Sequence, residues 1–287
     1  MKKGVNPLTK VIITQIVLIF LMMVWLIPAY TMIINGFKSN SEILSSKALV
    51  PPISFSTYAF QQAWAGLEQP ILNSLSVILP VAIISTVFGS MAAYYFDILS
   101  NSFSKRNKFF SDFAFTIVAL ATFIPYQATL MPLTRFMVSI NGLGTYWGLI
   151  FAYLIFYLPT GALLMSIFIS VVPARLTEAA RIDGASDLRI FFRVVLPSVL
   201  PGFIATLIFI FIMSWNVFFI PLVLVTNPSM SLVSVSVESY TGGFGTLYNE
   251  TFAAAVLASM VPLILFMFLG RYFIRGLMAL GSGGKGV

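Results

Sequence analysis

Six stretches of 20 or more residues contain no Asp, Glu, Lys or Arg, and together they make up about half of the 287-residue chain. They are residues 11–34, 71–96, 113–134, 147–172, 201–226 and 251–270. A helix crosses the hydrocarbon layer of a bilayer with about 20 apolar residues. Barrel strands would instead show alternation over segments of about ten residues. The chain is therefore predicted to be an all-α polytopic membrane protein with six transmembrane helices.

The composition excludes several classes of protein. Charged residues make up 9% and hydrophobic residues 59% of the chain, whereas soluble domains carry about 25% charged residues. The chain has no Cys and no His, so thiolate and imidazole chemistry, disulfides and the commonest metal ligands are excluded. Because the six windows contain no carboxylate, coupling to protons through a buried acid is disfavoured. Energy for any transport should therefore enter from outside the membrane segments.

The basic residues predict the orientation. With the N-terminus inside, 13 of the 16 Lys and Arg residues fall on the cytoplasmic side and only Lys38, Lys47 and Arg135 fall outside. This asymmetry follows the positive-inside rule and predicts that both termini are cytoplasmic. The first window is too long for the apolar core of a signal peptide, so it is expected to be a retained span. The net charge of +7 thus indicates topology and contact with membrane lipid, and no nucleic-acid partner.

The predicted spans suggest two parts. Residues 1–70 hold the first span and an outer segment, and residues 71–287 form a core transmembrane domain. The longest predicted cytoplasmic segment of this core is 173–200.

Segment 173–200 is predicted to form two short helices around a turn. Pro173 suits the first turn of a helix, and Glu178 is spaced for ion pairs with Arg175 and Arg181. Asp183-Gly184 should end the helix, with Gly184 in the left-handed conformation.

The second helix of this segment has its own signals. Ser186 can cap it and Asp187 complements its positive end. Leu188, Phe191, Phe192 and Val195 would then share one apolar face, and Pro197 and Pro201 would end the helix. By composition alone the segment could be an interfacial amphipathic linker.

The order of residues favours a more specific interpretation. Glu178-Ala179-Ala180, Gly184 after three intervening residues, and Leu196-Pro197 resemble the EAA loop of ABC-importer permeases. The resemblance to the maltose-type branch of carbohydrate permeases covers nearly the whole chain. It includes, with the segment around Pro125 and Pro132, these motifs: Asn73-Ser74-Leu75, Gly142-Leu143, Thr145-Tyr146-Trp147-Gly148, Trp215-Asn216 and Arg271 to Gly276. Two departures are Val217, where an acidic residue is usual, and Asp97, near a usual Arg.

The resemblance implies a type I ABC-importer permease fold and a role as the smaller, six-span subunit of a heterodimeric pair. Its implied partners are a second permease subunit, an ATP-binding subunit dimer that carries ATP and Mg, and an extracellular or periplasmic sugar-binding protein. The chain itself would carry no cofactor and no catalytic residue. Coupling to the ATPase is expected through the following residues: Glu178, Ala179, Ala180, Asp183, Gly184, Ala185, Leu196 and Pro197.

Two further sets of residues are candidates for contacts with solute and with the binding protein. Tyr126, Gln127, Trp215 and Asn216 lie within the windows and suit an uncharged polyhydroxyl substrate, although they equally suit hydrogen bonds between helices. Gly242, Gly243, Phe244 and Gly245 allow a protruding outer turn that would contact the binding protein, or an ordinary surface loop.

The predicted function is import of a mono- or oligosaccharide by alternating access, in the cell membrane of a bacterium or archaeon. Another small uncharged solute carried by the same fold is the alternative. A stand-alone secondary transporter or channel and an intramembrane enzyme are disfavoured, because the windows lack charges and the chain lacks His and Cys.

Overall fold

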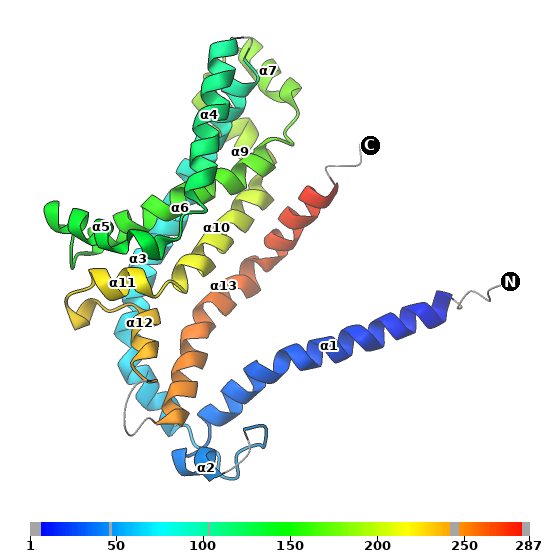
Figure 1. The fold of residues 1–287 in the computed structure, drawn as a ribbon. Coiled ribbons are helices and arrows are strands. Elements are labelled where there is room, and N and C mark those ends of the chain that lie inside the picture. The colour runs from blue at the N-terminus through cyan, green and yellow to red at the C-terminus, as the bar shows by residue number, and fades with distance from the viewer. Residues whose placement is uncertain (1–6, 46–47, 103, 242–246, 283–287) are drawn as a thin grey trace. The chain divides into compact units, whose positions relative to one another are not determined.

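The computed structural model describes residues 7–45, 48–102, 104–241 and 247–282, and every regular element among them is a helix (Figure 1). The chain forms two compact units: Met1–Leu67 with Val237–Ser259, and Glu68–Ser236 with Met260–Val287. The helices are α1 (Pro7–Gly36), α2 (Asn40–Ser45), α3 (Tyr58–Ser100), α4 (Lys105–Ala121), α5 (Tyr126–Ser139), α6 (Tyr146–Ile169), α7 (Ala174–Ile182), α8 (Asp187–Ile190), the π turn η1 (Phe191–Val195), α9 (Leu196–Ser198), α10 (Leu200–Trp215), α11 (Phe219–Leu224), the 3-10 turn η2 (Pro228–Met230), α12 (Val233–Glu238) and α13 (Tyr248–Ser282).

Four of the predicted spans are single helices, and two are broken. Helices α1, α3, α6 and α13 are each long and apolar enough to cross a membrane. The window 113–134 is instead divided between α4 and α5, which meet at an angle of 96°. The window 201–226 is helical to Trp215 and then breaks before α11. The α8–α9 segment also bends by 84° into α10, so six spans result if each bent pair counts as one.

The first unit is held by polar and aromatic contacts near the end of α1. The side-chain amide of Asn35 donates to the Ala48 carbonyl oxygen at 3.1 Å. Asn40 Oδ1 accepts from the backbone N–H of Tyr248 at 2.9 Å. The Phe37 ring lies 4.3 Å from that of Phe55, centroid to centroid. These contacts order the segment that follows α1 and join it to the first turn of α13.

In the second unit, α3 and α6 approach so closely that their backbones touch. A Cβ on Gly89 would lie 2.5 Å from the carbonyl carbon of Gly161, and a Cβ on Gly161 would collide with the Ser85 carbonyl oxygen. Val81 and Ala162, on either side of this contact, are buried. Small residues at a crossing point are how helices pack closely in lipid, where the hydrophobic effect does not drive helices together.

Gly161→Ala should therefore destabilise the protein by about 1–3 kcal/mol, because the backbone of one helix must move to accommodate the new methyl group. The matched control is Gly270→Ala, where the nearest neighbour is the Phe266 ring at 3.3 Å, which can rotate away. Thermal unfolding in detergent, followed by Trp fluorescence, should show a lower midpoint for the first variant only. Equal midpoints would contradict the close crossing.

Candidate functional site

Helix α7 ends in a turn that only a residue free to adopt positive φ fits without strain. Gly184 has φ +78°. Its N–H donates to the Arg181 carbonyl oxygen and the Ala185 N–H donates to that of Ala180, both at 3.0 Å. These are the two hydrogen bonds of a Schellman motif. The predicted helix stop at Asp183-Gly184 is confirmed, and the turn is fixed by backbone bonds rather than by side chains.

Charged side chains around this turn pair differently from the sequence prediction. The guanidinium of Arg181 contacts Asp187 at 3.1 Å across the turn, whereas Glu178 forms no ion pair with any described residue. The predicted pairs of Glu178 with Arg175 and Arg181 are therefore wrong. Ser186 stands at the N-cap of α8, but its hydroxyl makes no capping bond. The Arg181–Asp187 pair is solvent-exposed, so its contribution to stability is small.

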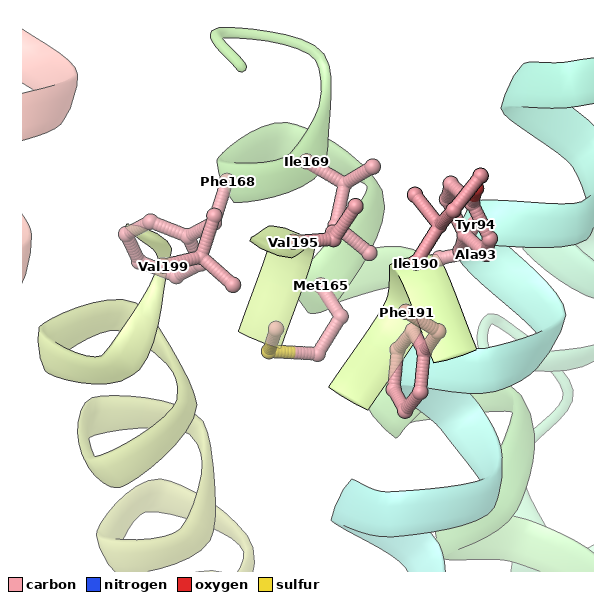
Figure 2. Packing of buried hydrophobic residues seen from close by; sticks show 9 residues of the cluster. All are labelled: Ala93, Tyr94, Met165, Phe168, Ile169, Ile190, Phe191, Val195 and Val199. Carbon is pink, nitrogen blue, oxygen red and sulfur yellow. The ribbon is translucent and has the colours of Figure 1, made fainter. Parts of the chain in front are cut away.

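The second half of the segment is anchored in a hydrophobic cluster. Ile190, Phe191, Val195 and Val199 are buried. They pack against residues from the ends of α3 and α6 (Figure 2), namely Ala93, Tyr94, Met165, Phe168 and Ile169. This cluster connects residues 190–199 to α6 and α3 through mainly apolar contacts.

The apolar face predicted for this helix is half wrong. Phe191 and Val195 are buried as predicted, but Leu188 is 56% and Phe192 48% exposed. Phe191–Val195 is a π turn, which bears on the position of Phe192 but not on that of Leu188, because Leu188 precedes it in α8. A π turn bonds i to i+5, so the 3.6-residue period used for the prediction does not hold across it.

The apolar residues of the EAA-like motif divide between partly buried and exposed positions. Ala180, Ala185 and Leu196 pack against the hydrophobic cluster, whereas Ala179 and Pro197 are exposed. The inward residues thus hold α7 against its own chain.

Sequence reasoning missed Ile182, which is 87% exposed at the C-terminus of α7. Asp183 and Gly184, which follow it, are exposed as well. A large aliphatic residue in a short polar helix of a predicted cytoplasmic segment was the signal that could have indicated it.

A cavity of about 910 Å³ lies between the ends of α3 and α6 and one side of α7. Asp97 of α3 and Asn101, which directly follows α3, line it on one side, and Glu178 and Arg181 of α7 line it on the other. Glu178 thus borders a hollow of its own chain and remains solvent-exposed. Within the described ranges no three His, Cys, Asp or Glu residues come together as a metal site.

The four candidate solute-path residues occupy the two helix breaks. Tyr126 and Gln127 are the first residues of α5, directly after its bend from α4. Trp215 ends α10 and Asn216 follows it as the C-cap. Helix α11, which follows the second break, packs against α5, which follows the first. The fold therefore makes neighbours of the two helices that start at these breaks.

These four side chains differ in their accessibility. Gln127 and Asn216 are exposed, and the Asn216 amide donates back to the Ile212 carbonyl oxygen at 2.7 Å. Trp215 is buried and stacks on Phe211, with 5.5 Å between ring centroids. The rings of Tyr126 and Phe156 meet in a T-shaped arrangement, with 6.1 Å between their centroids. The candidate contacts for a binding protein, Gly242, Gly243, Phe244 and Gly245, lie outside the described residues.

A helical chain with four to six helices long and apolar enough to cross a membrane, and with an exposed helix–turn–helix, belongs to the class of polytopic membrane proteins. Residues 85–278 match the family described as the inner membrane component of binding-protein-dependent transport systems. The chain belongs to this family.

Known proteins resemble it over most of their length. The glucose import system permease protein GlcU of Saccharolobus solfataricus is 55% identical over 287 residues, which is all of both chains. The diacetylchitobiose uptake system permease protein NgcG of Streptomyces coelicolor is 30% identical and covers 94% of this chain and 88% of its own. A chain of a bacterial ABC transporter for import of the acidic polysaccharide alginate superposes with a TM-score of 0.75 at 18% identity, covering 95% of this chain and 99% of that one. The chain therefore has the fold of an ABC-importer permease.

Two adjacent Phe residues provide a test of how segment 173–200 is anchored in the hydrophobic cluster. Phe191→Ala should cost about 3–5 kcal/mol, because it empties a buried site in the hydrophobic cluster. Phe192→Ala should cost about 1 kcal/mol or less, because its ring is half exposed. Thermal unfolding of the two purified variants measures the difference. A larger loss with Phe192→Ala would show that the register around the π turn is wrong.

Proposed function

We propose that this chain is a permease subunit of an ABC transporter that imports a sugar, with ATP hydrolysis on a separate partner. The full-length similarity to a glucose import permease and the similarity to a permease for diacetylchitobiose support a carbohydrate substrate. D-Glucose is the first solute to test. Another small uncharged solute remains the alternative, since the neutral amides of Gln127 and Asn216 would bind any polyhydroxyl compound.

The observation that carries the proposal is the rigid helix–turn–helix of residues 174–199. Its turn is closed by two backbone hydrogen bonds, and its second half is buried against α6 and α3. A flexible loop would absorb a displacement, whereas this unit transmits it to the helices that it touches. ATP-driven closure of an ATPase dimer against α7 would thus shift the spans between inward-open and outward-open states, which is alternating access by rigid-body motion.

The expected partners follow from this mechanism. One subunit of an ATP-binding dimer, which carries ATP and Mg, would contact the exposed face of Ala179, Ile182 and Asp183 on the cytoplasmic side. A second permease subunit would complete the solute path. A sugar-binding protein would dock on the outer segment that includes residues 242–245. The predicted cytoplasmic location of both termini belongs to the same arrangement.

Replacement of Gly184 tests the coupling role. Gly184→Val should lower uptake of labelled D-glucose at least tenfold, since a β-branched residue in the left-handed region costs roughly 1–2 kcal/mol and opens the turn. Gly184→Asn is the matched control, because Asn tolerates that region. Uptake is measured in proteoliposomes that contain the complete transporter, with the affinity of the binding protein for sugar as an internal reference.

Both variants should leave the core of the chain intact, because no atom lies within 4 Å of a Cβ placed on Gly184. Near-normal uptake by Gly184→Val would refute the coupling role. Uptake of no sugar by the wild-type complex would refute the proposed substrate class.

Ile182 tests the contact with the ATPase. Burial of an exposed Ile side chain in a partner contributes about 1.5–3 kcal/mol, so Ile182→Ser should reduce the ATP-binding subunit retained during purification by about tenfold. Ile182→Val keeps most of the apolar surface and should retain the subunit. Equal recovery of the ATP-binding subunit with the Ser and Val variants would show that Ile182 lies outside the contact.

A further inference from the structure

The side chain of Asn73 uses every hydrogen-bonding position of its carboxamide. Its Nδ2 donates to the backbone carbonyl oxygens of Ser229 at 2.8 Å and Ser231 at 3.0 Å. Its Oδ1 accepts from Gln69 Nε2 and from the Tyr146 hydroxyl, both at 2.8 Å. Asn73 is 2% exposed. One buried amide thus joins α3, the first residue of α6 and the segment that follows α11.

Ser74, the next residue on α3, adds a second bond to the same segment. Its Oγ accepts from the backbone N–H of Val233 at 2.8 Å, and its side chain is buried. Val233 is the first residue of α12. The N-terminal N–H groups of a helix have no partner within the helix, so Ser74 satisfies one that would otherwise be buried without a partner.

Helix α12 in turn contacts the break between α10 and α11. The hydroxyl of Ser234 donates to the carbonyl oxygen of Val217 at 2.8 Å. Val217 is buried and directly follows Asn216, one of the candidate solute-path residues. A carbonyl at a helix break in a membrane requires a partner from elsewhere in the protein, and Ser234 supplies it. Asn73 and Ser74 are therefore linked through α12 to the backbone at the second break.

We propose that Asn73 and Ser74 are positioning residues for transport, which hold segment 229–234 so that the break at residues 216–218 keeps its shape. The proposal rests on the proposed function, because it assigns this break to the solute path. Loss of one bond leaves a buried N–H or C=O without a partner, a penalty that segment 229–234 can avoid only by moving away from α3.

Single substitutions at Ser74 separate positioning from folding. Ser74→Ala removes the acceptor for the Val233 N–H, and Ser74→Thr restores an acceptor oxygen. Ser76→Ala is the control on the same helix, since the Ser76 hydroxyl is exposed and bonds only to Leu72 of its own helix. In the reconstituted transporter, Ser74→Ala should lower the maximal rate of labelled D-glucose uptake about tenfold, with an unchanged half-saturating concentration of the loaded binding protein. Ser74→Thr should recover most of that rate.

The amide gives an independent variant of nearly the same shape. Asn73→Asp keeps both acceptor bonds but places a carboxylate against the carbonyl oxygens of Ser229 and Ser231, so it should reduce uptake at least as strongly as Ser74→Ala. Tyr146→Phe removes only one bond to Oδ1 and should have a smaller effect. Equal losses with Asn73→Asp and Tyr146→Phe would contradict the role of the donor half of the amide.

The absence of Cys from the chain permits a direct structural readout. Leu232 is 2% exposed within the held segment, so Leu232→Cys should be protected from a membrane-impermeant maleimide. Combination with Ser74→Ala or Asn73→Asp should increase its labelling rate at least tenfold. Ser229→Cys, at an exposed position, is the control for access of the reagent.

The proposal requires both a faster reaction of Leu232→Cys and a slower maximal uptake. If either stays at the wild-type value in both Ser74→Ala and Asn73→Asp, the positioning role is refuted. Because the labelling needs no solute, it distinguishes this outcome from failure of the proposed function, in which the wild-type complex itself takes up no sugar.

Discussion

A chain inside hydrocarbon must satisfy its backbone polar groups without water, and this constraint determines where the helices of this protein can stop. Helix α4 ends before Pro125, which has no N–H to satisfy. Helix α10 ends at Trp215, and the side-chain amide of its C-cap Asn216 donates to the Ile212 carbonyl oxygen. The carbonyl oxygen of Val217 accepts from the Ser234 hydroxyl. Both interruptions are therefore tolerated because local chemistry replaces the lost helical bonds. Irregular backbone supported in this way is typical of the points where membrane proteins line a path.

The membrane class and most of the spans could be predicted from the sequence, because apolar stretches of about 20 residues without charge are typical of membrane-spanning helices. The direction of the chain after residue 121 could not, since hydropathy does not record direction. The presence of Pro125 alone did not predict the break between α4 and α5. Pro28, Pro80 and Pro159 occur inside α1, α3 and α6, which continue through them. A Pro breaks a membrane helix only where the surrounding side chains and neighbouring helices also favour a break, and that information is tertiary.

Segment 173–200 was predictable where local rules determine its structure and unpredictable where packing does. Gly184 follows from the conformational freedom of glycine, and the structure gives it the predicted positive φ. The face of the next helix depended on a π turn, for which the residues Phe191–Val195 carry no local signal. The Asn73-Ser74 pair was visible as a motif resemblance, but its partners outside α3 lie 73 to 159 residues away. No periodicity in the sequence could have brought them together.

The cavity beside α7 bears on how a displacement of this helix would reach the membrane-spanning helices. A hollow of about 910 Å³ lies between one side of α7 and the end of α3, while Ala180 of α7 packs against the hydrophobic cluster. A displacement of α7 would therefore reach α6 through Ala180 and, beyond the turn at Gly184, through Ile190, Phe191 and Val195. The helix–turn–helix is thus fixed mainly where it packs in the hydrophobic cluster, while most residues of α7 are exposed. Under the proposed coupling role, the packing of that cluster would set how fully a displacement of α7 moves the spans. The cluster lies away from the exposed surface that an ATP-binding subunit would contact.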